Sequence, residues 1–259
     1  MTNSIKNIAI FFLAHYDDEF GVFHQIKYHL KNNDRVVIIY LTSSHLLGET
    51  DFTREAESLR SLNSIGLTNK DDVFFIGREA CIPDLKLHEN LKSAYKSSYK
   101  IIQELDNVQY IYTLSFEGGH PDHDATYLIS VALSKQLDLL NKSYQFTLYS
   151  GKKLYASFFR LFSPIEENGE VLSFPVSIRE GFEYFKLFLN YRSQPKTLLG
   201  LAPFFFFHIL FIKKQYLQKT LLHRIYQKPH EGKLLYERRG MCDYNEFRSA
   251  ANLFIKEII

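Results

Sequence analysis

Two short stretches of the sequence combine histidines with carboxylates, and each follows an apolar run. The first, AHYDDE, contains His15, Asp17 and Asp18, and the second, EGGHPDH, contains His120 and His123. Imidazole nitrogens and a carboxylate oxygen suit zinc and leave a coordination position open for water. His15 and Asp18 are three residues apart, which would place both on one side of a helix's first turn. Asp17 would then face the open position, where a hydrolase needs a general base.

Each stretch also has a purely structural interpretation. Asp17, Asp18 and Glu19 could cap a helix and interact with its dipole, and HPDH could form a turn followed by a cap. Two such clusters at strand ends are harder to explain in this way, because neighbouring carboxylates destabilise a fold unless a cation or a reaction compensates. The two stretches together therefore favour a functional site.

The elements that must position these stretches alternate between strands and amphipathic helices. Apolar runs predict strands at residues 8–13, 35–42, 72–77 and 108–115. Helical spacing predicts helices within residues 19–33, 51–67, 87–105 and 116–140. This alternation is typical of an α/β fold with a Rossmann-like, mostly parallel sheet flanked by helices. Ligands bind at the carboxyl ends of such strands, and both stretches lie there.

The alternating pattern changes at about residue 145. It predicts a catalytic core with the metal site over residues 1–145 and a smaller, aromatic-rich C-terminal portion over residues 146–259. The C-terminal portion would complete the fold and the substrate pocket, with further strands at residues 144–150 and 170–177.

One segment of the C-terminal portion, residues 184–230, is both basic and apolar. It contains eight Lys or Arg residues and no Asp or Glu, so the rest of the chain has 23 basic and 29 acidic residues, a net charge of −6. Its apolar part, residues 198–212, could be a buried hairpin or helix. Alternatively, its apolar side chains could insert into an anionic membrane surface, with Lys213, Lys214, Lys219 and Arg224 facing the headgroups.

The composition narrows the class of protein and its compartment. The net charge of the 259-residue chain is +2, so we expect no nucleic-acid partner. Its two cysteines, Cys81 and Cys242, fit neither a disulfide framework nor a zinc knuckle, which indicates a reducing cytoplasm. The N-terminus shows no signal-peptide cleavage site, and no apolar run reaches the roughly 20 residues of a membrane-spanning helix. We expect a cytoplasmic protein, peripheral at the inner membrane face if the basic segment binds lipid. The sequence does not predict an oligomeric state.

Four motifs resemble those of one enzyme family. AHYDDE resembles the AHPDDE signature of the LmbE/PIG-L deacetylases, with Tyr16 in place of proline, and EGGHPDH resembles their second, histidine-bearing motif. Arg54 and Glu57 resemble the family's intermediate R-x-x-E segment, and YRSQ at residues 191–194 resembles a late motif. The resemblance is strongest over residues 7–135.

The resemblance implies a zinc-dependent N-deacetylase acting on N-acetylglucosamine units carried by inositol, lipid, peptide or another sugar. It implies one zinc ion per chain, held by His15, Asp18 and His123. Asp17 would be the general base. His120 in protonated form would stabilise the oxyanion or protonate the leaving amine.

Three further residues have assignments with open alternatives. Arg54 would contact substrate hydroxyls, or could pair with Glu55 or Glu57. Asp122 would orient a histidine ligand, or could cap its helix. Tyr16 would place a ring along the sugar site. The loop after residue 42 could supply His45 or Glu49 to the pocket rim, or be a solvated loop.

Two other functions compete with the deacetylase. Clustered Asp and His residues also build two-metal phosphoester hydrolases. A non-catalytic sugar-binding relative would keep the pocket but would be expected to lack Asp17 or His120, and both are present.

Overall fold

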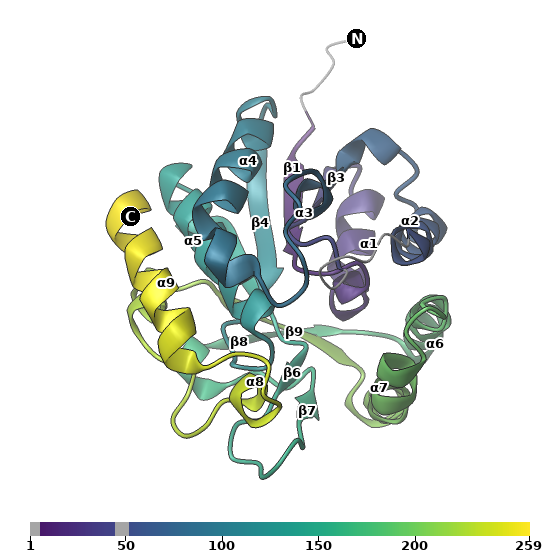
Figure 1. Cartoon of the computed structure of the whole chain (residues 1–259). Coiled ribbons are helices and arrows are strands. Elements are labelled where there is room, and N and C mark those ends of the chain that lie inside the picture. The colour runs from purple at the N-terminus through teal and green to yellow at the C-terminus, as the bar shows by residue number, and fades with distance from the viewer. Residues whose placement is uncertain (1–5, 45–51) are drawn as a thin grey trace.

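The computed structural model describes residues 6–44 and 52–259, so the rim positions His45 and Glu49 lie outside the described residues. A mixed seven-stranded sheet has the order β3-β2-β1-β4-β5-β9-β8 (Figure 1). These strands are β1 (Ile8–Leu13), β2 (Arg35–Tyr40), β3 (Val73–Phe75), β4 (Val108–Leu114), β5 (Ser143–Phe146), β8 (Val171–Pro175) and β9 (Lys214–Lys219). The strands from β3 to β5 are parallel, whereas β9 and β8 join antiparallel. The predicted mostly parallel α/β fold is confirmed.

Helices cover both faces of the sheet. They are α1 (Phe23–Lys31), α2 (Thr53–Ile65), α3 (Ile76–Glu79), α4 (Leu91–Gln103), α5 (Pro121–Gln136), α6 (Ile178–Phe188), α7 (Pro195–Phe207), α8 (Leu235–Arg238) and α9 (Tyr244–Ile258). A π-helical turn, His208–Ile212, extends α7, and a short hairpin is formed by β6 (Tyr149–Ser150) and β7 (Arg160–Leu161). Helices α4, α5 and α9 pack on one face, and α1, α2, α6 and α7 on the other (Figure 1).

The alternation of side chains along β1 explains why the sheet is covered on both faces. Ile8, Ile10 and Phe12 belong to the core cluster beneath α4, α5 and α9. Ala9 and Phe11 belong to the opposite cluster. Successive strand residues point to opposite faces, so a continuous apolar run needs a layer on each side.

The strand order brings the two histidine-bearing stretches together. β1 pairs with β2 on one side and with β4 on the other, and all three strands are parallel. The direction of chain progression through the sheet reverses between β1 and β4, which creates a crevice at the carboxyl ends of these strands. AHYDDE follows β1 and EGGHPDH follows β4, so both reach this crevice.

The C-terminal residues extend the same sheet. β9 pairs antiparallel with β5, with Tyr144 opposite Lys219, and β8 pairs with β9. Helices α6 and α7 lie side by side on the face of α1 and α2, away from α9 (Figure 1).

Candidate metal centre

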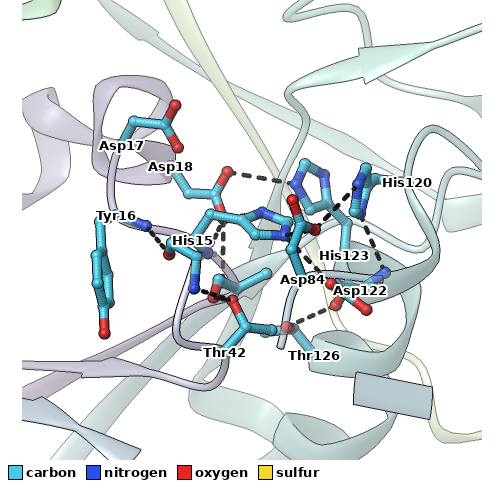
Figure 2. Close-up of polar contacts among 12 residues, drawn as sticks. His15, Tyr16, Asp17, Asp18, Thr42, Asp84, His120, Asp122, His123 and Thr126 are labelled. Carbon is cyan, nitrogen blue, oxygen red and sulfur yellow. Dashed lines mark hydrogen bonds and ion pairs between the residues drawn. The ribbon is translucent and has the colours of Figure 1, made fainter. Parts of the chain in front are cut away.

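The chain folds back on itself directly after β1. Asp18 opens a short 3-10 helix, Asp18–Gly21, and its Oδ2 accepts hydrogen bonds from the backbone N–H groups of Ala14 (3.0 Å) and His15 (2.7 Å). His15 therefore lies in the bend before this helix, rather than in the same helical turn as expected. The bend still directs both side chains toward His120 and His123 (Figure 2).

The three predicted metal ligands come together beside this bend. Asp18 lies between His15 and His123, with 3.4 Å from its Oδ2 to His15 Nδ1 and 3.3 Å from its Oδ1 to His123 Nε2. One ring nitrogen each from His15, His120 and His123 lies within 4.8 Å of the others. All four side chains are buried. The geometry brings together side chains from two stretches that are about a hundred residues apart in sequence.

The charges and hydrogen bonds of this cluster fit a divalent cation. His123 is buried, yet within the described part of the chain neither of its ring nitrogens has a hydrogen-bond partner. Burial opposes protonation of His15, but the carboxylates of Asp84, Asp18 and Asp122 raise its pKa well above the ordinary value. Buried acidic groups thus surround this position and attract positive charge, which a zinc ion with nitrogen and oxygen ligands would supply.

Asp84 is part of this cluster, although the sequence did not single it out. Its Oδ1 lies 3.0 Å from His15 Nε2 and 3.7 Å from His120 Nε2. It belongs to the loop after α3, so the motif IPDL downstream of a third strand end was the available signal. Burial opposes ionisation of Asp84, but His15 and His120 lower its pKa well below the usual range.

Asp122 holds the Asp84 loop and contacts a ligand ring. Its Oδ2 lies 3.2 Å from His15 Nε2 and accepts a 2.7 Å hydrogen bond from Leu85 N–H, while Oδ1 accepts one from Leu87 N–H. The side chain that caps α5 is His120, whose Nδ1 accepts from Asp122 N–H. The contacts therefore match the first alternative for Asp122, in which it orients a histidine.

The hydrogen bonding of His120 favours the neutral ring. Its Nδ1 accepts the Asp122 N–H at 3.2 Å, which leaves the ring proton on Nε2. Burial, reinforced by the charge on His15, lowers the pKa of His120 to about 4. The neutral ring can donate a hydrogen bond from Nε2, and the protonated form of His120 expected from the sequence stays a prediction.

Asp17 and Arg54 lie on the open side of the cluster. Asp17 Oδ2 accepts a 2.6 Å hydrogen bond from Gln194 Nε2, and its Oδ1 is 4.0 Å from an Arg54 guanidinium nitrogen. Arg54 also donates to the carbonyl of Ser44. Its alternative partners have other contacts, because Glu55 pairs with Arg78 and Glu57 accepts from Ser193.

A cavity of about 360 Å³ opens over these groups. Its wall includes His15, Asp17, Asp18, Arg54, Asp84 and His120 from the first half of the chain. The C-terminal portion contributes side chains that the sequence did not indicate, namely Tyr149, Phe159, Lys196, Thr197, Leu201, Arg239 and Met241. Aromatic rings together with a few polar and charged groups are a common lining of small-molecule sites.

Comparison with known proteins identifies a family domain in the first half of the chain. Residues 10–134 match the family described as PIG-L: GlcNAc-PI de-N-acetylase. The chain carries a PIG-L domain. No curated protein matches the sequence.

Several solved structures have a fold similar to that of this chain. One is the A40926 pseudoaglycone deacetylase Dbv21, at 13% identity and a TM-score of 0.59, covering 84% of this chain and 99% of that one. A second is a deacetylase of the teicoplanin pathway, at 14% identity and a TM-score of 0.58. The match covers 82% of this chain and 97% of that one. A third is the conserved protein TT1542 from Thermus thermophilus, at 17% identity and a TM-score of 0.54. The match covers 83% of this chain and 95% of that one. At these identities the likeness establishes the fold alone.

Tyr16, where the PIG-L signature has proline, does not line the cavity. Its side chain is 1% exposed and packs edge-on against Tyr40 and Phe75, at ring-centroid distances of 5.1 and 5.2 Å. The ring points away from the histidines (Figure 2). The predicted substrate contact is therefore wrong, because Tyr16 packs into the apolar core and is not part of the cavity wall.

The late motif Tyr191–Gln194 contacts the carboxylates of the PIG-L domain's earlier motifs. The Tyr191 hydroxyl donates to Glu19 Oε1 at 2.7 Å, and Ser193 donates to Glu57 through both its hydroxyl and its N–H. Gln194 donates to Asp17. Hydrogen bonds from this C-terminal motif therefore connect the bend after β1 with helix α2.

Replacing Gln194 by leucine is expected to move the acidic limb of the pH–rate profile to higher pH. Burial raises the pKa of Asp17, and the Gln194 hydrogen bond opposes this rise. A base must be ionised to act, so losing the donor raises the pKa and activity is lost earlier as the pH falls. We expect kcat/KM near neutral pH to fall roughly tenfold with the metal content unchanged. The control is Gln103→Leu at an exposed position of α4. An acidic limb at the same pH as in the parent would show that Gln194 does not change the pKa of Asp17.

Proposed function

We propose that this PIG-L domain removes the N-acetyl group from an N-acetylated amino sugar of the N-acetylglucosamine type, releasing acetate and a free amine. The observation that supports it best is the convergence of His15, Asp18 and the unpartnered His123 beneath a cavity that also exposes Asp17 and His120. These three residues would hold one zinc ion per chain.

The bound zinc would supply Lewis-acid activation of water and of the acyl oxygen. Asp17 removes the proton of the attacking water as the tetrahedral intermediate forms. Burial raises the pKa of Asp17, which favours its holding that proton and returning it to the leaving amine. His120 donates its Nε2–H to the developing oxyanion, a contact worth roughly 3 kcal/mol of the barrier.

The remaining side chains of the cavity would position the sugar. Arg54 lines the cavity and would donate to substrate hydroxyls, and the contacts of Asp84 with His15 and His120 would hold both rings in place. We propose a cytoplasmic location, supported by two free cysteines, Cys81 and Cys242. A lipid-linked or polysaccharide-linked amino sugar is the proposed substrate class.

A two-metal phosphoester hydrolase is the second candidate. One observation favours it, because His15, Asp84, His120 and Asp122 form another group of possible ligands. However, this group shares His15 with the proposed ligand set, so a second ion would compete for the same ring. We therefore expect one metal ion per chain, and two would favour the phosphoesterase.

The function is tested by acetate release from a panel of N-acetylglucosaminyl inositols, nucleotide sugars and polyprenyl-linked sugars. We expect release from at least one class, loss of activity with a chelator, and recovery on adding zinc. Phosphate release without acetate would support the phosphoesterase. Tight binding of a sugar without any product would identify a non-catalytic relative.

A further inference from the structure

Helix α7 and the π-helical turn after it form an apolar surface that the rest of the described chain leaves uncovered. Leu199 is 81% exposed, Phe207 55% and Phe211 68%, and Phe206 and Ile212 are also exposed. Their spacing is close to one helical face. Together, Pro195–Ile212 form one helix long and apolar enough to cross a membrane by length and composition, with 22% of its residues buried. This finding corrects the expectation that no apolar segment is long enough to span a membrane.

The packing of the opposite helix face argues that the helix lies on a membrane rather than spans it. Phe205 is buried against Phe20, Phe162 and Phe188, at ring-centroid distances of 5.1 to 6.0 Å. Gly181 of α6 packs so closely on Ile209 that an added Cβ would lie 2.7 Å from it. A spanning helix would lose all of these contacts, whereas an interfacial helix keeps one face on the protein.

Positive charge surrounds the apolar face at both ends. Lys196 is exposed at the start of α7, and Lys213 and Lys214 are exposed directly after its end. Segment 184–230, which contains the whole helix, has no acidic residue, although the rest of the chain has a net charge of −6. Arg224 of this segment is buried and Lys228 pairs with Glu237, so Lys196, Lys213 and Lys214 are the basic groups that flank the apolar face and match an anionic lipid surface.

The apolar surface adjoins the mouth of the active-site cavity. Lys196, Thr197 and Gly200 belong to α7 and also line the cavity above the metal cluster. Figure 1 shows α6 and α7 on the side of the molecule away from α9. A membrane that contacts α7 would therefore lie beside the cavity opening, within reach of an amino sugar on a lipid anchor.

We propose that Leu199, Phe206, Phe207, Phe211 and Ile212, with Lys196, Lys213 and Lys214, form a lipid-docking surface that binds this protein peripherally to anionic bilayers. This surface deepens the proposed function, on which it rests, by presenting the cavity to lipid-linked substrates. Docking itself needs no substrate, so it can be measured independently of deacetylation.

The test is co-sedimentation of the full chain with vesicles of equal parts phosphatidylglycerol and phosphatidylcholine, compared with phosphatidylcholine alone. We expect binding to the anionic vesicles at low salt and much weaker binding at about 0.5 M NaCl or to neutral vesicles. Phe207→Ser/Phe211→Ser should weaken vesicle binding at least about tenfold. Lys213→Gln/Lys214→Gln should weaken it roughly fivefold for each lysine removed.

The controls change matched residues on other surfaces. Leu253→Ser alters an exposed leucine of α9, and Lys96→Gln/Lys100→Gln removes two exposed lysines of α4, so both should bind vesicles like the parent. A parent chain that ignores anionic vesicles at low salt would overturn the proposal. So would a dimer in sedimentation velocity that Phe207→Ser/Phe211→Ser converts to monomer without changing vesicle binding, because the face would then join two copies. Acetate release from a soluble substrate should not change in either docking variant.

Discussion

Asp17→Asn is expected to reduce acetate release by roughly 10³-fold while one metal ion per chain is retained. Asparagine keeps the size of the side chain but cannot accept the proton of the attacking water, and proton transfer by a positioned base contributes about 10²–10⁴-fold. Asp17 is not one of the proposed metal ligands, since Asp18 is the carboxylate that contacts His15 and His123. Acetate release and metal content, measured on the same preparation, give both quantities.

The matched control for this variant is Asp71→Asn, which makes the same chemical change at an exposed position remote from the cavity. It should retain parent activity. A loss below about tenfold in Asp17→Asn would assign the proton transfer to another group. Loss of the metal together with activity would instead make Asp17 a ligand.

His123→Ala is expected to abolish stoichiometric zinc binding. His123 is buried and its Nε2 lies 3.3 Å from Asp18 Oδ1, so its removal deletes a ligand. Asp18 keeps the hydrogen bonds that it accepts from the backbone N–H groups of Ala14 and His15. Losing a residue that only supports a ligand typically costs 10–100-fold in metal affinity, so losing a ligand should cost more than about 100-fold. Acetate release should fall in parallel.

Thermal unfolding separates this effect from a general loss of stability. A ligand that binds the folded state stabilises it, so zinc should raise the Tm of the parent chain. The Tm of His123→Ala should not respond to zinc, whatever its value without metal. His223→Ala, at an exposed position of the 3-10 helix Leu222–Tyr226, should respond like the parent. A zinc response in His123→Ala equal to that of the parent would exclude His123 as a ligand.

Much of the site was predictable because it is built at strand ends. The apolar runs of β1 and β4 are local signals, and strand direction requires their carboxyl ends to meet at one edge of the sheet. His15, Asp18 and His123 therefore converge as expected from their positions alone. The R-x-x-E segment likewise contributes Arg54 to the cavity wall.

The sequence did not predict properties of a side chain that depend on its neighbours in the folded chain. Tyr16 lies between two residues of the site, and only the bend after β1 directs its ring into the apolar core beside Tyr40. The tautomer of His120 depends on one backbone N–H of α5. Neither contact follows from residue type or spacing.

The sequence by itself determined the α/β class, the strands and the strand-end position of the candidate ligands, because hydrophobic periodicity is a property of adjacent residues. Only the tertiary structure decided that Asp84 contacts His15 across 69 positions and that Gln194 contacts Asp17 across 177. It also decided that one face of α7 packs on the protein while the other stays exposed. Such contacts depend on how loops and helices pack against the sheet, and packing between distant segments leaves no periodic signal in the chain.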